Sequence, residues 1–139
     1  MTAPAGIKPG APFNLTLVAG RSSEPSQEIS VSWGYTSAVG GNEDYEIGQY
    51  ATTQYLGPDK SNTKENIVIE AVAPRELANW KDPSVVLTVA VHQAVGKTAK
   101  SVVNGYIVEF NVADEVTEEQ VVGKDGIGWK QDTTCQFHW

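Results

Sequence analysis

The most regular alternation of apolar and polar positions in the chain runs from Val85 to His92. One side of this stretch carries only large apolar residues, namely Val85, Leu87, Val89 and Val91. A period of two that is rich in β-branched residues predicts a strand with a large apolar inner face. Residues 93–97 supply a turn around Gly96, and residues 98–103 form the expected return strand. We therefore predict a central hairpin that the rest of the chain must cover.

Similar alternation predicts further strands over the ranges 13–19, 28–35, 44–53, 67–72 and 105–112. The clearest of them is 28–35, where Ile29, Val31 and Trp33 fall on one side. The segment 74–80 differs because it begins with Pro74, and proline suits the first turn of a helix, so one or two helical turns are expected there. Short strands separated by turns at intervals of about 10 residues indicate an all-β antiparallel sandwich.

The two ends of the chain lack this alternation. Residues 1–12 contain three prolines, two glycines and three alanines, which predicts an extended N-terminal arm. Residues 13–112 are expected to form the sandwich. Residues 113–139 are predicted to be an irregular C-terminal extension, in which Thr117 and Gln120 have the spacing of a capping box for a short helix reaching Val122.

The length of 139 residues fits a single domain. A net charge of −7 argues against nucleic acid as a partner, because a phosphate backbone requires a basic face. No apolar stretch approaches the roughly 20 residues needed to span a membrane, so no membrane insertion is expected. Cys135 is the only cysteine and no apolar run follows Met1. These features predict synthesis in the cytoplasm without a signal peptide.

The predicted strands resemble a fibronectin type III domain between about residues 12 and 103. In that family a core tryptophan lies on the second strand, as Trp33 does, and a tyrosine opens the third strand, as Tyr45 does. The sequence departs from the family at Val85 and Gln93, where the family has tyrosine and asparagine. The resemblance implies an immunoglobulin-like fold and a module used for adhesion, spacing or assembly. Its motifs are Pro12-x-Asn14-Leu15, Ile29-x-Val31-x-Trp33, Asp44-Tyr45-Glu46-Ile47 and Val85-x-Leu87-x-Val89-x-Val91-x-Gln93-x-x-Gly96.

Two stretches superficially resemble binding loops. Gly96-Lys97-Thr98 matches the end of a phosphate-binding loop, but Val91 stands where that loop requires its first glycine, so a hairpin turn is the better interpretation. Residues 59–70 carry oxygen-bearing side chains at calcium-loop spacing, but Lys64 stands where the loop requires glycine. A third group, Asn42, Glu43, Asp44 and Glu46, could hold a hard cation, although a plain acidic loop is favoured.

The histidines and the cysteine give no stronger signal. A zinc site would need His92, His138 and Cys135 together with a carboxylate, yet His92 is distant in sequence from the other two. A nucleophile pair of Cys135 and His138 lacks any accompanying oxyanion motif. We therefore predict no catalytic residue, no metal and no cofactor, and a protein that is not an enzyme.

The aromatic residues suggest where partners would bind. Trp33 and Tyr45 are expected in the core, whereas Tyr35, Tyr50 and Tyr55 fall outside the core phase or in loops. Large aromatic residues in the last eleven positions must either fold back over the sandwich or dock into a neighbouring subunit, and docking is preferred. The predicted partner-binding residues are Trp129, Phe137, Trp139, Tyr35, Tyr55 and Lys97.

These observations together favour a non-enzymatic structural module. An acidic sandwich without disulfides is similar to decoration, fibre or tail proteins of bacteriophages. The expectation is a virion protein that docks, through its terminal extensions, on neighbouring protein subunits including copies of itself. The alternative is an adhesion module that binds a cell-surface carbohydrate or receptor through loops 36–43 and 93–97.

Overall fold

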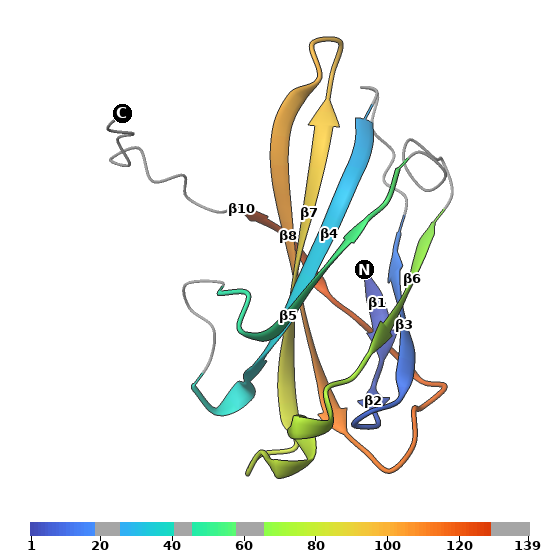
Figure 1. Cartoon of the computed structure of the whole chain (residues 1–139), viewed down its shortest axis with the longest axis vertical. Coiled ribbons are helices and arrows are strands. Elements are labelled where there is room, and N and C mark those ends of the chain that lie inside the picture. The colour runs from blue at the N-terminus through green and yellow to red at the C-terminus, as the bar shows by residue number, and fades with distance from the viewer. Residues whose placement is uncertain (19–25, 41–45, 58–65, 129–139) are drawn as a thin grey trace.

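The computed structural model describes residues 1–18, 26–40, 46–57 and 66–128 (Figure 1). The described chain is all-β apart from two short 3₁₀ turns, η1 (Ala38–Gly40) and η2 (Arg75–Asn79). A four-stranded sheet, here called the small sheet, has the order β6 (Ile67–Val72), β3 (Pro12–Leu17), β1 (Thr2–Pro4) and β9 (Gln120–Val122). The second sheet, here called the large sheet, has the order β10 (Lys124–Gly128), β8 (Lys100–Val112), β7 (Ser84–Val95), β4 (Ser26–Ser37) and β5 (Gln49–Tyr55). Its sixth strand, β2 (Gly6–Ile7), pairs with β8 in parallel, while the other pairs are antiparallel.

The core lies between the inner faces of the two sheets. Phe13 of β3 meets Phe110 of β8 edge to face, with ring centroids 5.9 Å apart and planes at 89°. Phe110 also stacks against Tyr35 of β4 at 6.5 Å. Aromatic pairs at such distances add stabilisation beyond that of their buried area. These three rings therefore join the small sheet to the large sheet.

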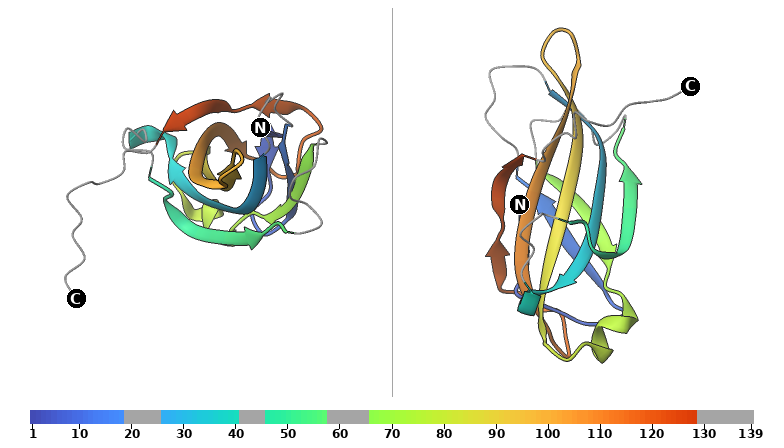
Figure 2. Two further views of the ribbon diagram at one scale, coloured as in Figure 1. Left: turned by 90° about the horizontal axis from the view of Figure 1, so that it is seen from above. Right: turned by 90° about the vertical axis from the view of Figure 1, so that its left-hand side faces the viewer.

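The predicted central hairpin is confirmed and is the longest pair of strands in the fold. Strands β7 and β8 remain in register from Ser84↔Asn111 to Val95↔Lys100. Val85, Leu87, Val89 and Val91 are all buried, as their shared phase predicts. Gly96 has φ +79° in the turn that joins the two strands, a conformation that glycine adopts without strain. The tip of the hairpin projects beyond the neighbouring strands (Figures 1 and 2).

The other sequence predictions inside 13–112 hold with shifted boundaries. Strand β6 spans the predicted residues, β4 is longer than expected at both ends, and the 74–80 segment forms η2 with Leu77 buried. The expected strand 44–53 begins only at Gln49. Ile47 and Gly48 were expected in this strand, but they precede β5 and lie against the backbone of β4. A Cβ added to Gly34 would lie 2.3 Å from the carbonyl oxygen of Ile47, so only glycine fits there.

The prediction that residues 1–12 form an extended arm is wrong. Strand β1 lies between β3 and β9, with Thr2 opposite both Thr16 and Val122. Met1, Ala3 and Ile7 are buried in the core. The backbone hydrogen bonds of this segment determine its place, and small side chains such as Ala3 and Gly6 allow it to pack closely. Of the residues that suggested an arm, Ala3 and Pro4 belong to β1 in the interior of the small sheet, and Pro12 begins β3.

The predicted helix from Thr117 to Val122 is also absent. Residues 120–122 form β9 instead, and residues 124–128 form β10 beside β8. The Thr117 hydroxyl accepts a hydrogen bond from the Gly6 amide at 2.9 Å, which is an interaction over 111 positions in place of the local cap. Both ends of the described chain are therefore parts of the same two sheets.

Candidate functional site

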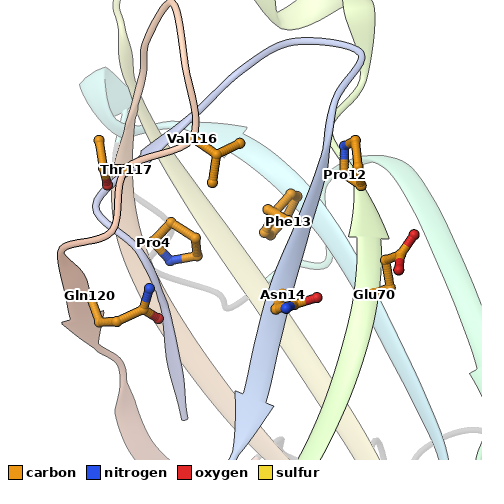
Figure 3. Close-up of a pocket in the computed structure, with 8 residues that line it drawn as sticks. All are labelled: Pro4, Pro12, Phe13, Asn14, Glu70, Val116, Thr117 and Gln120. Carbon is orange, nitrogen blue, oxygen red and sulfur yellow. The ribbon is translucent and has the colours of Figure 1, made fainter.

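A concave feature lies on the outer face of the small sheet. Asn14 pairs with Glu70 across β3 and β6, and Pro4 pairs with Gln120 across β1 and β9. The register of β1 and β3 at Thr2↔Thr16 brings Pro4 level with Asn14. These four residues therefore form one row across all four strands. The row is the floor of a pocket of about 400 Å³ (Figure 3).

The pocket has an apolar end and a polar rim. Pro12, Phe13 and Val116 line it together with the floor residues and Thr117. Figure 3 shows Pro4, Val116 and Phe13 on neighbouring segments, with Asn14 and Glu70 alongside. Its volume is within the range of ligand pockets in proteins, in which apolar walls carry a few polar groups that orient the ligand.

The segment 113–119 holds the residues of this wall in place through backbone hydrogen bonds to the N-terminal strands. The amide of Ala113 donates to the carbonyl of Ile7 at 2.8 Å, and the amide of Ala5 donates to the carbonyl of Glu119 at 2.8 Å. The amide of Thr117 donates to the carbonyl of Gly6 at 3.1 Å. A wall that is fixed in this way is preformed, so a ligand does not have to order it on binding.

The surroundings of the pocket are acidic. Glu70 lines it, and Asp114, Glu115, Glu118 and Glu119 are exposed on the segment that carries its wall. Within the described ranges, none of these five carboxylates forms an ion pair with a lysine or arginine. Each negative charge therefore remains available to an incoming cation, and the net charge of −7 adds to the local potential.

A second polar group lies near the tip of the hairpin. The Nε2 atom of His92 lies 2.7 Å from the hydroxyl of Ser101 on the opposite strand. Beside it, Gln93 donates to Glu28 at 3.4 Å, and Asn104 donates to the side-chain oxygen of Gln93. The pocket residues named above include none of these side chains.

The predicted partner-binding residues do not gather at one place. Tyr55 is 70% exposed on β5, and Lys97 is exposed in the hairpin turn. Tyr35 is 1% exposed, so the expectation that it lies outside the core phase is wrong, because it continues the inward phase of Val31 and Trp33. Trp129, Phe137 and Trp139 lie outside the described residues. Parts of loop 36–43 also lie outside them, whereas 93–97 is the end of β7 and the turn.

The environment of Tyr35 is unusual for a tyrosine. Its hydroxyl has no hydrogen-bond partner in the described structure. Burial raises the pKa of the phenol well above its ordinary value, and the nearby Trp33 side chain offsets a small part of that rise. This group is enclosed in the core and belongs to the structure rather than to a surface site.

Other candidate ligand sets gave no site within the described part of the chain. Its histidine, aspartate and glutamate side chains form no group of three that could hold a metal ion. The residues outside that part are Cys135, His138, the calcium-like stretch 59–65, and Asn42, Glu43 and Asp44 of the possible cation group. Among the described elements there is also no helix with the length and apolar character of a membrane span.

Comparison with known proteins gives two matches. The model of a family described as the Nis1 family matches residues 1–111. The chain is also 25% identical, over 135 residues, to a protein of Colletotrichum orbiculare named "Necrosis-inducing secreted protein 1". That alignment covers 95% of this chain and 79% of the relative. The family match therefore includes strands β1 to β7 and nearly all of β8, but not Val116, Thr117 and Gln120 of the pocket.

These matches contradict the resemblance to fibronectin type III domains and the assignment to bacteriophage particles. Alternating strands with a buried tryptophan occur in many two-sheet folds, so Trp33 and its neighbours did not distinguish between families. The expected virion location, and the expected docking on virion subunits and on copies of the chain, are wrong for the same reason. The adhesion alternative finds no support either. The secreted relative contradicts the expectation of a protein made in the cytoplasm without a signal peptide.

Proposed function

The chain belongs to the Nis1 family, and on this premise we propose that it is a secreted protein that causes necrosis in the tissue it reaches. The observation that carries the proposal is the alignment over 95% of the chain with a relative named for both properties. The family match begins at residue 1. It therefore includes β1, which belongs to the small sheet, and β2, which pairs with β8.

We further propose that the protein acts by binding a target rather than by catalysis. The pocket supports this proposal because prolines, amides and one carboxylate line it, a combination suited to holding a ligand. The contact between His92 and Ser101 resembles a base beside a nucleophile, but both residues lie on paired strands outside the pocket, and His92 is partly exposed. Nucleophilic catalysis also requires a third group that orients the base.

Purified protein infiltrated into plant leaf tissue tests the necrosis proposal. Electrolyte leakage from the tissue measures cell death, and an unrelated acidic protein of similar mass serves as the control. We expect leakage that rises with protein concentration and exceeds that caused by the control. Equal leakage from both proteins would contradict the proposal.

Secretion is tested separately in cultures of the source organism. Immunoblots of culture filtrate and of cell extract, each probed for this protein and for an intracellular marker, show where the protein accumulates. We expect the protein in filtrate that lacks the marker. Protein found only together with the marker would contradict secretion.

A further inference from the structure

We propose that the pocket on the small sheet binds a lysine or arginine side chain in an extended segment of a partner protein. The inference concerns the chemistry of the ligand and stands whether or not the protein causes necrosis. It rests on the lining of the pocket, on the charges around it and on the hydrogen bonds that fix its wall.

The lining matches the two parts of a long basic side chain. Pro12 and Val116 present apolar surface against which an aliphatic stem can pack, and Pro4 lies buried beside them. Glu70 lies on the same row and presents a carboxylate to the charged end. Lysine and arginine characteristically bury the stem while the charged group remains at a polar rim. Asn14 and Gln120 add amide groups that can bond to the backbone of the partner.

Charge decides between a basic and a neutral ligand. The carboxylate of Glu70 has no cationic partner among the described residues, and the wall segment adds the exposed carboxylates of Glu115 and Glu118 nearby. A cation brought into the pocket therefore meets the carboxylate of Glu70, and the exposed carboxylates of the wall segment add to the negative potential around it. The side chain that best matches this set of groups is a basic one.

The polar floor residues also lack competing interactions within the pocket. The side chain of Asn14 forms no hydrogen bond in the described structure, and that of Gln120 donates only to the carbonyl of Glu118 at 3.4 Å, which is a long contact. The Thr117 hydroxyl, in contrast, is already used by the Gly6 amide and the Glu119 carbonyl. We therefore assign ligand contacts to Glu70, Asn14 and Gln120, and a structural role to Thr117.

NMR titration of the ¹⁵N-labelled protein tests the proposal. The probe is the peptide acetyl-Ala-Ala-Arg-Ala-Ala-amide, and its matched control carries citrulline in place of arginine, which keeps the shape and removes the charge. We expect saturable shifts at the amides of Asn14, Glu70 and Gln120 with the arginine peptide. The citrulline peptide should bind up to about fivefold more weakly, which is the upper end of what one ion pair at an exposed site provides.

Two variants locate the binding. Glu70→Gln removes the charge at an exposed position with little change in shape, and should weaken the arginine peptide about fivefold while leaving citrulline binding unchanged. Glu76→Gln is the matched control, because Glu76 is exposed on η2 and does not line the pocket. It should bind the arginine peptide like the unchanged protein. Circular dichroism confirms that both variants remain folded.

Three outcomes would overturn the proposal. Equal affinity for the arginine and citrulline peptides would show that charge is irrelevant. Shifts confined to the β7–β8 hairpin would place the ligand elsewhere. Shifts at the pocket amides caused by a neutral oligosaccharide such as chitohexaose, but not by the arginine peptide, would assign the pocket to carbohydrate.

Discussion

The hydroxyl oxygen of Thr117 accepts a hydrogen bond of 2.9 Å from the backbone amide of Gly6, and so joins the N-terminal strands to the segment that follows β8. The Thr117 amide returns a bond to the Gly6 carbonyl at 3.1 Å. A Cβ at Gly6 would lie 2.8 Å from the Thr117 methyl carbon, so the two residues are in close contact. This contact holds together the two ends of the described chain and one wall of the pocket.

Replacing Thr117 with valine tests the importance of this contact. The variant keeps the shape of the side chain, but it leaves the Gly6 amide without its acceptor and removes the bond from the hydroxyl to the Glu119 carbonyl. We expect the free energy of unfolding to fall by about 1–2 kcal/mol, which is typical for two lost hydrogen bonds. Urea denaturation measures the change. Thr98→Val, at an exposed position in the hairpin turn, is the matched control and should stay within about 0.5 kcal/mol of the unchanged protein.

The close packing of residues 47 and 48 against β4 gives a second prediction. Gly48 has φ +90°, and a Cβ there would lie 2.4 Å from the carbonyl oxygen of Tyr35. Gly96 has φ +79° but no atom within 4 Å of its added Cβ. Gly96→Ala should therefore cost only the backbone strain, about 1–2 kcal/mol. Gly48→Ala should cost at least about 3 kcal/mol, because steric overlap adds to that strain.

Thermal and urea unfolding of the two alanine variants distinguish strain from overlap. Similar losses in both variants would show that the segment can move away from β4. In that case the close approach of Gly48 to Tyr35 would not constrain the fold.

The buried phenol of Tyr35 predicts a dependence of stability on pH. Its folded pKa is raised, so the folded protein keeps a proton that the unfolded chain loses above about pH 10. The stabilisation that depends on this proton is therefore fully present below about pH 10. Above that pH the free energy of unfolding falls, by up to about 1.4 kcal/mol for each pH unit.

Urea denaturation at about pH 8 and pH 11 tests this prediction, since the two values lie on either side of the tyrosine pKa. Tyr35→Phe should lose less stability between them than the unchanged protein does. Tyr55→Phe is the control, because Tyr55 is 70% exposed, and it should lose as much as the unchanged protein. An identical pH dependence in all three proteins would show that Tyr35 ionises as readily in the folded state as in the unfolded chain.

The sequence was sufficient to predict the strands that have one buried face and one exposed face. Strand β6 shows this directly, because Ile67, Ile69 and Ala71 are buried and the residues between them are exposed. Strand β7 was predicted for the same reason. Residues 1–7 could not be recognised as strands, because Ala3 and Gly6 are small and carry little hydrophobic signal. Long-range pairing with β3, β8 and β9 determines their structure.

The pocket was not predictable from local sequence patterns. Its floor combines Pro4, Asn14, Glu70 and Gln120, which come together only through the order of four strands. The alternation already indicated that Asn14 and Glu70 face outward. It could not indicate which strands lie next to each other in the sheet. The capping-box spacing at Thr117 was misleading because a distant amide, that of Gly6, uses the same hydroxyl.

We propose that the folded two-sheet protein itself induces necrosis, the property for which its Colletotrichum relative is named. Leaf electrolyte leakage caused by the unchanged protein, Gly96→Ala and Gly48→Ala at equal concentration tests this claim most directly. We predict leakage with the unchanged protein and with Gly96→Ala, and a loss with Gly48→Ala in proportion to its unfolded fraction at the temperature of the assay. Leakage from the unchanged protein no greater than that from its heat-denatured form would contradict the claim.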